Sequence, residues 1–307
     1  MSMDFLKREA PVTDGEAAAL ARYTDWGGGM ARAALVEAVA LGRLVRVNAG
    51  VTATAAAVIT AWMTRGGVSP DKIALIAAVV FALTSGGNAF NDISDHKIDR
   101  INRPGRPIPT GAISVRKAAI VAGLFLGAGV LLSLPLSGWC IALTMADAGL
   151  LVAYGLYSKT LGVLKNVIVG YLVASAFLIG AFRLDNVDLV IATLSACAFL
   201  ATVAREIVKD VEDMDGDRRH GARTLPILAG PRAAFAIAFS CLAVAVGWAL
   251  ALYAMGEVND AYLALILMAG AGFAAAWFVR SRATRLSQQT IMAASLLVLA
   301  AFGLGRL

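Results

Sequence analysis

Two runs of aspartates with the same spacing are the densest acidic features of this chain. The pattern Asp-x-x-Asp-x-x-x-Asp occurs first as Asp92, Asp95 and Asp99, and again as Asp210, Asp213 and Asp217. On a helix, offsets of 0, 3 and 7 residues fall within about 60° of arc, so we expect each triplet to point in one direction. Mg²⁺ suits such a site, because it binds one or two carboxylates and completes its shell with water and phosphate oxygens. The triplets therefore predict metal-bound diphosphate chemistry.

Carboxylates at the end of a helix are unfavourable unless a cation neutralises them. They repel one another, and the C-terminus of a helix carries a partial negative charge. Asn88 and Asn91 lie beside the first triplet and offer neutral oxygen ligands, although a buried asparagine can equally hydrogen-bond a neighbouring backbone group. A surface ion-pair network is the alternative, but it does not explain the same offsets at two places. We predict metal ligands at both asparagines and all six aspartates.

Basic residues near the triplets are candidates for binding the diphosphate. Cations beside a metal can hold a diphosphate and stabilise it as a leaving group. The alternative is that they only fix the orientation of the chain in a membrane. The residues for which we predict diphosphate binding are Lys97, Arg100, Arg103, Lys159, Arg205 and Lys209.

Four residues are candidates for a direct role in the reaction, namely Tyr154, Tyr157, Lys159 and Arg205. The face of an aromatic ring stabilises a nearby carbocation, although tyrosines also occur as ordinary anchors at membrane interfaces. Asp147 is the one acid that lies deep within an apolar stretch, and its role stays open between function and pairing with a polar group.

The composition identifies the elements that must position these residues as membrane helices. The chain has 307 residues, of which 59% are hydrophobic and 16% charged, with a mean hydropathy of +0.74. Nine apolar stretches approach the roughly 20 residues that cross a bilayer. They are 48–64, 73–91, 118–134, 139–156, 166–182, 187–206, 232–255, 260–279 and 289–305. We therefore predict an all-α polytopic membrane protein, with nine transmembrane helices around a central cavity.

The distribution of basic residues predicts the orientation. With the N-terminus in the cytoplasm, 23 of the 27 lysines and arginines fall on the cytoplasmic side, as do both aspartate triplets. Residues 1–46 would form a cytoplasmic segment, in which Ala31–Leu44 is a candidate amphipathic surface helix, and we find no signal peptide. Residues 47–307 would form the membrane domain. The net charge of +6 then reflects orientation, and nothing indicates nucleic acid as a partner.

The positions of the triplets predict an internal repeat. One triplet follows the stretch 73–91, and the other follows 187–206, four stretches later. An even number of crossings between them makes the halves parallel repeats of four helices, with the ninth helix appended. Three cysteines, Cys140, Cys197 and Cys241, lie in apolar stretches without paired spacing, so we expect small buried side chains.

With these motifs, the chain resembles the UbiA superfamily of intramembrane prenyltransferases. The resemblance rests on the segment from Asn88 to Asp99, the segment from Arg205 to Asp217, and Tyr157-Ser-Lys159, and it covers nearly the whole chain after about residue 40. It implies nine spans in a cell membrane, and transfer of a prenyl group from an isoprenyl diphosphate to a lipophilic acceptor with Mg²⁺ as cofactor. The membrane lipid is the surrounding partner, and no obligate protein partner is evident.

The loop from Asp99 to Gly111, together with Arg205-Glu-Ile-Val-Lys-Asp210, is most similar to one branch of this superfamily. That branch joins a geranylgeranyl group to the hydroxyl of geranylgeranylglyceryl phosphate in ether-lipid synthesis. Chlorophyll synthases share part of the loop. An aromatic prenyltransferase, acting on 4-hydroxybenzoate, a quinone precursor or a chlorophyllide, is the alternative within the enzyme class. Outside it, the alternative is a cation-coupled transporter, which predicts acids near the middle of the bilayer.

Overall fold

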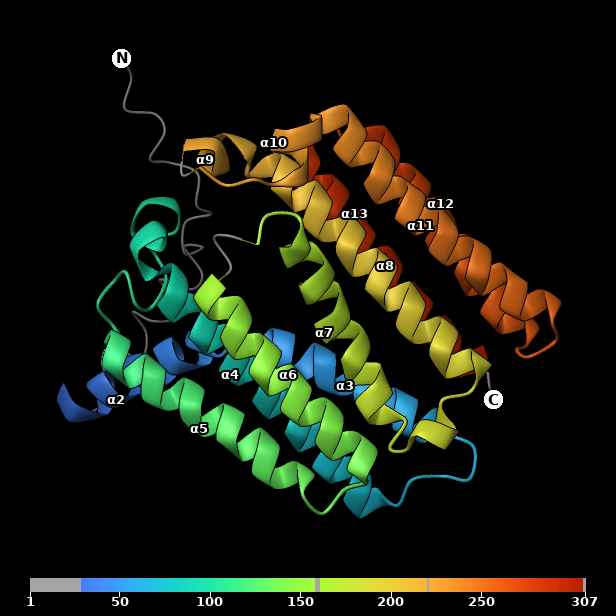
Figure 1. The fold of residues 1–307 in the computed structure, drawn as a ribbon, viewed down its shortest axis with the longest axis horizontal. Coiled ribbons are helices and arrows are strands. Elements are labelled where there is room, and N and C mark those ends of the chain that lie inside the picture. The colour runs from blue at the N-terminus through green and yellow to red at the C-terminus, as the bar shows by residue number, and fades with distance from the viewer. Residues whose placement is uncertain (1–28, 158–160, 220, 306–307) are drawn as a thin grey trace.

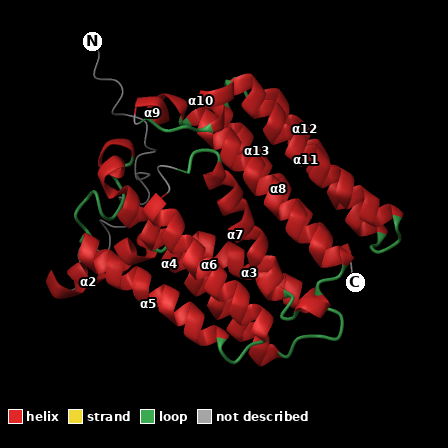
Figure 2. Ribbon diagram, in the orientation of Figure 1, coloured by secondary structure: helices red, strands yellow, loops and turns green. Residues whose placement is uncertain are grey.

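The structure is a computed structural model that describes residues 29–157, 161–219 and 221–305. Within these residues the regular structure is helical throughout (Figures 1 and 2). The long helices before the second motif are α2 (Gly29–Leu44), α3 (Val47–Met63), α4 (Pro70–Asn102), α5 (Val115–Ser133), α6 (Gly138–Tyr157), α7 (Leu164–Gly180) and α8 (Leu189–Glu212). The remaining helices are η3 (Leu184–Asn186), α9 (Met214–Arg219), α10 (Leu225–Ala229), α11 (Pro231–Ala254), α12 (Asp260–Val279) and α13 (Thr284–Gly305).

Each of the nine apolar stretches expected from the sequence coincides with one helix, so the all-α prediction is confirmed. Seven helices in the described part of the chain are long and apolar enough to cross a membrane. Helices α2 and α3 meet at a bend of 49° and together would add an eighth, while α7 is an apolar helix of 17 residues. The protein is therefore a multi-pass membrane protein, and the count of nine crossings stays a prediction.

Helix α2 begins at Gly29 and ends at Leu44, close to the amphipathic helix expected over Ala31–Leu44. Glu37 on this helix forms an ion pair with Lys117 at the start of α5. The position of α2 on the membrane surface stays a prediction, and residues 1–28 lie outside the described residues.

Several helices begin at caps that the sequence provides. The Asp188 carboxylate accepts hydrogen bonds from the first backbone N–H groups of α8, and the Asn259 side chain does the same for α12. Pro70 and Pro231 occupy first-turn positions of α4 and α11, where a missing N–H group costs nothing. Local chemistry therefore fixes where these spans start.

Two helices organise the bundle, α4 in the first half and α8 in the second. Helix α4 packs against α3, α5 and α6, and α8 packs against α7, α11 and α13. In Figure 1 the blue-to-green helices of the first half and the yellow-to-red helices of the second half lie on opposite sides, with α7 between them. Contacts of α3 with α7 and α13 join the halves. The parallel repeat itself stays a prediction.

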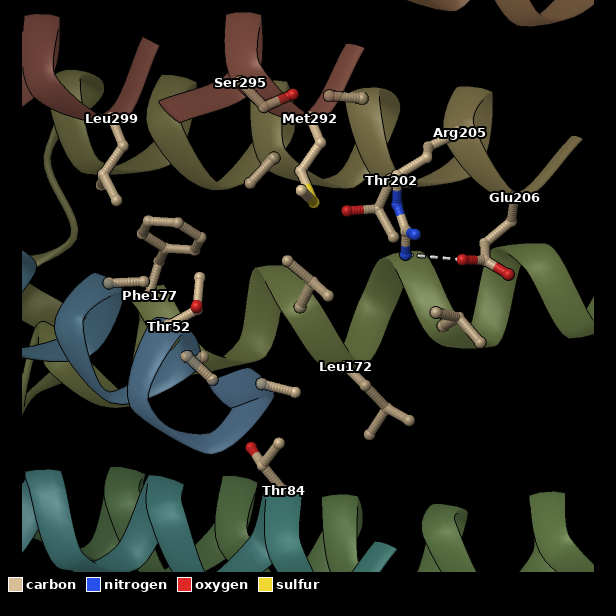
Figure 3. A pocket seen from close by; sticks show the side chains of 18 of the residues that line it. Thr52, Thr84, Leu172, Phe177, Thr202, Arg205, Glu206, Met292, Ser295 and Leu299 are labelled. Atoms are coloured by element: carbon tan, nitrogen blue, oxygen red, sulfur yellow. Dashed lines mark hydrogen bonds and ion pairs between the residues drawn. The ribbon is translucent and has the colours of Figure 1, made fainter. Parts of the chain in front are cut away.

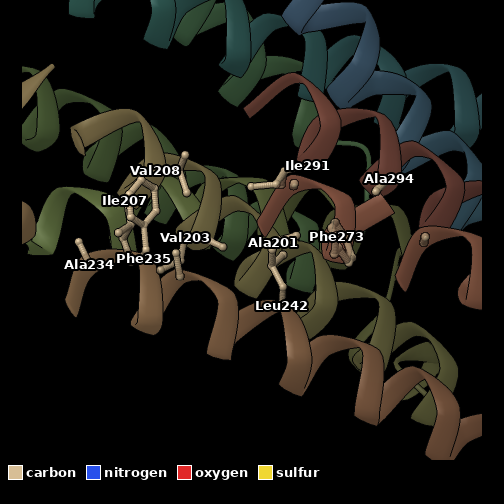
Figure 4. Packing of buried hydrophobic residues seen from close by; sticks show 14 residues of the cluster. Ala201, Val203, Ile207, Val208, Ala234, Phe235, Leu242, Phe273, Ile291 and Ala294 are labelled. Atoms are coloured by element: carbon tan, nitrogen blue, oxygen red, sulfur yellow. The ribbon is translucent and has the colours of Figure 1, made fainter. Parts of the chain in front are cut away.

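Small side chains fill much of the core. In one cluster of buried residues in the second half of the chain, Ala201, Ala234 and Ala294 pack with Phe235 and Phe273 between α8, α11, α12 and α13 (Figure 4). Helices in lipid associate through close packing of small residues, since lipid is as apolar as the side chains. Large apolar side chains also cover the outside of the bundle. Cys140 and Cys197 are buried and Cys241 is partly buried, as expected.

Glycines permit the closest helix contacts. A Cβ atom on Gly87 of α4 would lie 2.5 Å from Cδ2 of Leu151 on α6, and one on Gly155 of α6 would overlap the Phe90 ring. On α7, a Cβ atom on Gly180 would overlap the backbone carbonyl oxygen of Ala57 on α3. Backbone cannot move aside as a flexible side chain can, so this contact determines how closely α3 and α7 approach.

We expect Gly180→Ala to destabilise the protein, because the added methyl group forces α3 and α7 apart. Overpacking of this kind costs about 1–3 kcal/mol. The matched control is Gly149→Ala on α6, where the glycine is exposed and a Cβ atom meets open space. Thermal unfolding of the purified variants in detergent would show a lowered midpoint for Gly180→Ala only. Equal midpoints would contradict the assigned contact.

Candidate functional site

A cavity of about 640 Å³ lies inside the helical bundle. Its wall is formed by α3, α4, α6, α7, α8, α11, α12 and α13. Most of the wall is apolar, and Figure 3 shows Leu172, Phe177, Met292 and Leu299 on it. Polar side chains gather where α4 and α8 approach their motif ends. They are Arg46, Asn88, Asn91, Tyr154, Arg205, Glu206 and Lys209.

The first aspartate triplet lies on one continuous helix, as predicted, because α4 stays helical to Asn102. Asp92 and Asp99 are only 3% and 5% exposed. One guanidinium nitrogen of Arg106 lies 3.1 Å from the Asp92 carboxylate and 2.5 Å from that of Asp99. Arg46 reaches the same Asp92 oxygen from the other side, at 2.6 Å. The acids are thus held by cationic side chains, which agrees with the expectation that they need a cation.

Backbone geometry brings these two arginines to the acids. Arg46 joins α2 to α3 and adopts a left-handed conformation with φ of 49°, which an arginine adopts only under constraint from its surroundings. After α4 the chain turns back, with hydrogen bonds from Arg103 N–H to the Asp99 carbonyl and from Ile113 N–H to the Pro107 carbonyl. This turn folds Arg106 under the helix end.

The second triplet does not lie on one helix, so that prediction is wrong. Helix α8 ends at Glu212, Asp213 is its C-cap, and Asp217 belongs to the separate short helix α9. Acidic side chains are repelled by the partial negative charge of a helix C-terminus. Because they accumulate after Glu212, they disfavour continuation of α8. A backbone hydrogen bond nevertheless joins Asp217 to Asp213, because the Asp217 N–H group donates to the Asp213 carbonyl at 2.9 Å.

Buried ion pairs surround the second motif. Asp210 is 3% exposed and contacts two side chains of α7, Lys165 at 2.7 Å and Asn166 at 2.9 Å. One turn earlier on α8, Glu206 pairs with Arg205 at 2.6 Å and with Lys209 at 3.3 Å (Figure 3 shows the first pair). Each buried carboxylate of α8 therefore has a basic partner, as buried charges require.

The residues at the two motifs fit a divalent metal in their donor chemistry. The buried oxygen atoms that lack a hydrogen-bond partner include Oδ1 of Asn91, Oδ1 of Asn166 and Oδ2 of Asp217. Oxygen is the ligand atom that Mg²⁺ prefers, and an unpaired buried oxygen is costly unless something fills the gap. Within the described residues, no group of three or more histidine, cysteine or acidic side chains is already assembled around one point. Arginine and lysine hold the acids instead.

Burial raises the pKa of the Asp99 carboxyl, although Arg106 opposes the shift. Burial likewise raises the pKa of Asp217, against the opposing effect of Lys165. Asp99 lies beyond the apolar span Pro70–Lys97, and Asp217 lies on α9, beyond the span Leu189–Glu212. A bound cation favours the charged carboxylate and so acts in the opposite direction to burial.

The structure brings part of the predicted site together at the cavity. Asn88, Asn91 and Tyr154 line the cavity from α4 and α6, and Arg205 and Lys209 line it from α8. None of the six motif aspartates is part of the cavity wall: three are buried, two partly buried and Asp213 is exposed. Lys159 falls among residues 158–160, outside the described residues.

Four predicted bases and aromatic residues also lie away from the cavity. Lys97, Arg100 and Arg103 are exposed, and so is Tyr157, at 59%. Each helix position turns by 100°, so Lys97 and Arg100 point away from the triplet with which they share α4. Tyr157 is the last residue of α6, one turn beyond Tyr154, where the helix has already left the cavity. The base that contacts the first triplet is Arg106, further along the loop.

Five residues that the structure places beside the motifs are not among the predicted site residues, namely Arg46, Arg106, Lys165, Asn166 and Glu206. Arg106 and Lys165 carry a general signal as bases close to the motifs, and Glu206 stands four residues before Asp210 as Asn88 stands four before Asp92. Apart from Glu206, these residues come from neighbouring segments, and no local pattern indicates which acid each one meets.

Fold and site together define a multi-pass membrane enzyme with a charged mouth leading into an apolar cavity. Residues 51–301 match the model of the UbiA prenyltransferase family. The chain belongs to this family, which confirms the predicted resemblance and the predicted prenyltransferase class. The transporter alternative is not supported.

Curated relatives are similar over most of the chain. The digeranylgeranylglyceryl phosphate synthase of Natronomonas pharaonis is 38% identical over 265 residues, which cover 86% of this chain and 95% of the relative. The enzyme of the same name from Methanoculleus marisnigri is 41% identical over 210 residues, 68% of this chain and 75% of the relative.

Solved structures share the fold. A structure of digeranylgeranylglyceryl phosphate synthase in membranes has a TM-score of 0.74 and 30% identity, covering 88% of this chain and 98% of that one. A UbiA homolog from Archaeoglobus fulgidus, bound to GPP and Mg²⁺, has a TM-score of 0.68 over 86% of this chain and 98% of its own. At 18% identity, the second likeness concerns the fold alone.

Proposed function

We propose that this chain transfers a geranylgeranyl group from its diphosphate to the hydroxyl of geranylgeranylglyceryl phosphate, with Mg²⁺ as cofactor, in ether-lipid synthesis. The observation that carries the proposal is the cavity, whose wall is charged beside the motifs, at Arg46, Arg205, Glu206 and Lys209, and mostly apolar elsewhere. A prenyl diphosphate has the same division into a charged head and an apolar chain. The identity of 38% with a synthase of this name along 95% of its length supports the choice of acceptor.

The metal ligands form two sets in this proposal. Asn88, Asn91, Asp92, Asp95 and Asp99 would hold one Mg²⁺ beside α4, and Asp210, Asp213 and Asp217 a second beside α8 and α9. Bound Mg²⁺ would neutralise the negative charge that develops on the diphosphate as it leaves. Asp92 and Asp210 are buried next to cationic side chains, so each would exchange a basic partner for the metal.

The bases displaced from the acids would then bind phosphate oxygens. Arg205 and Lys209 line the cavity beside Glu206, and Arg46 lines it beside Asp92. Guanidinium groups bind phosphate through two parallel hydrogen bonds, and lysine binds it as a point charge. Lys97, Arg100 and Arg103 stay predictions as further phosphate ligands, and so does Lys159, which lies outside the described residues.

The apolar wall would hold the prenyl chain and exclude water from the reacting carbon. The bond from C1 to the diphosphate oxygen breaks, and its electron pair leaves with the diphosphate. A lone pair of the acceptor hydroxyl forms the new C–O bond, and its proton passes to water, a carboxylate or the departing diphosphate. Tyr154 lies between the two motifs in the cavity wall, where its ring would stabilise the allylic cation. Tyr157 keeps this role only as a prediction.

We propose that the mouth opens on the cytoplasmic side, because lysine and arginine concentrate on the side of both motifs. The prenyl diphosphate would then enter from the cytoplasm, and the lipid acceptor and the lipid product would remain in the membrane.

A panel of acceptors tests the proposed function. Purified enzyme with Mg²⁺ and geranylgeranyl diphosphate would receive geranylgeranylglyceryl phosphate, 4-hydroxybenzoate, a naphthoate or a chlorophyllide in separate reactions. We expect mass spectrometry to detect the diether product from the first acceptor and turnover at least about tenfold lower with each of the others. A heat-inactivated sample serves as the control. A prenylated aromatic as the main product would favour the aromatic alternative and contradict the proposed acceptor.

A further inference from the structure

A second polar feature lies in the cavity wall, away from the charged mouth. Asp147 on α6 is 3% exposed and lines the cavity. One of its carboxyl oxygens, Oδ2, accepts a hydrogen bond from the Ser175 hydroxyl on α7, and Tyr171 also makes a side-chain hydrogen bond to the group. The second oxygen, Oδ1, is buried and has no partner. Among the described residues, no lysine, arginine or histidine forms an ion pair with Asp147.

The depth of Asp147 relative to the metal motif follows from helix packing. Gly87 on α4 lies against Leu151 on α6, and Asn88 is the next residue on α4. Asp147 precedes Leu151 by four residues, which is about 6 Å along the helix axis. The carboxyl group is therefore about one turn further into the cavity than Asn88. Thr84, one turn before Asn88, also lines the cavity and projects toward it (Figure 3).

This depth matches the place where the new bond must form. In the proposed function the diphosphate lies at Asn88 and the motif acids, and the prenyl chain extends into the apolar interior. C1 of the prenyl group is attached to the diphosphate, so the attacking atom must approach just inside the mouth. Asp147 and Thr84 line the cavity at that level.

The chemistry of the unpartnered oxygen restricts what it can bind. A hydrocarbon chain offers no hydrogen bond, and a phosphate would bring a second negative charge next to a carboxyl group that has no base. A neutral hydroxyl fits both protonation states, because it donates to a carboxylate and accepts from a carboxylic acid. A buried polar atom left without a partner is costly, so a bound hydroxyl would remove that cost.

We propose that Asp147 binds the hydroxyl of the lipid acceptor and holds it toward C1 of the prenyl donor. The inference rests on the proposed function, which supplies an alcohol as the acceptor. Asp147 would thereby select an alcohol over a lipid without a hydroxyl. The hydrogen bond from the Ser175 hydroxyl would hold the Asp147 carboxyl group in place between α6 and α7.

Binding of two matched lipids, without Mg²⁺ or donor, tests the inference. The probes are geranylgeranylglyceryl phosphate and its deoxy analogue, in which hydrogen replaces the hydroxyl. We expect the wild-type protein to bind the hydroxyl lipid about tenfold more tightly, which corresponds to about 1.4 kcal/mol. Asp147→Leu should bind both lipids equally, whereas Asp147→Asn should retain part of the preference, because an amide still hydrogen-bonds a hydroxyl.

Thr144→Val is the matched control. Thr144 lies one turn from Asp147 on α6, and its hydroxyl is equally buried and unpartnered, but it is not part of the cavity wall. This variant should keep the tenfold preference. Thermal unfolding in detergent identifies variants that fold, and Asp147→Ala replaces Asp147→Leu if the leucine variant does not.

Two outcomes would overturn the inference, namely equal binding of the two lipids by the wild-type protein, or a full preference that survives in Asp147→Leu. Turnover with geranylgeranyl diphosphate is measured separately. Absent turnover with intact discrimination would count against the proposed function alone. Normal turnover without discrimination would count against the role of Asp147 alone.

Discussion

Asp213→Ala and Asp92→Asn should each reduce turnover by about a thousandfold, equivalent to about 4 kcal/mol of transition-state stabilisation. Each change removes one carboxylate from a proposed metal site, and no other acid of that site would replace the lost ligand. The substitutions differ in their structural consequences. Asp213 is exposed at the C-cap of α8, so alanine there leaves the core intact. Asp92 is buried, and asparagine preserves its shape beside Arg46 and Arg106.

Asp215→Ala is the control for this pair. Asp215 is an exposed acid on α9, two residues from Asp213, and it lies outside the repeated spacing. A general effect of negative charge at the mouth would lower activity in all three variants, whereas metal binding predicts normal turnover in Asp215→Ala. Initial rates with saturating donor and acceptor would separate these cases. Near-normal turnover in Asp92→Asn or Asp213→Ala would refute the metal assignment.

Removal of divalent cations should abolish turnover, and Mg²⁺ should restore it fully. Asp99 and Asp217 are partly shielded from water and repelled by neighbouring aspartates, and the diphosphate brings further negative charge. Arginine and lysine neutralise the acids when no substrate is bound, but they cannot at the same time neutralise both the acids and a diphosphate. The measurement is product formation after chelation with EDTA, followed by titration with MgCl₂.

A second readout separates metal binding from catalysis. Mg²⁺ with inorganic diphosphate should raise the unfolding midpoint of the wild-type protein, because a ligand that binds only the folded state stabilises it. The midpoint of Asp92→Asn should change little. NaCl at the same ionic strength controls for screening of exposed charges. Full activity after chelation, or equal stabilisation by NaCl, would show that the acids do not hold a metal.

The sequence alone determined the helices and the family. Spans are set by runs of apolar residues and by caps such as Asp188 and Asn259, which act within one turn of chain. The bilayer requires every backbone group to be paired within its own helix, so hydropathy is enough to locate the spans. The aspartate spacing on α4 likewise needs only helix geometry, and it was confirmed there.

The tertiary structure decided which charges meet. Arg46 and Arg106 reach Asp92 from a helix junction and from a loop, and Lys165 reaches Asp210 from α7. Such contacts depend on how helices distant in sequence pack, and charge alone does not choose among many lysines and arginines. The same packing places Asp147 in the cavity wall with one oxygen paired and one free. Local sequence supplied the chemical groups, and packing supplied their partners.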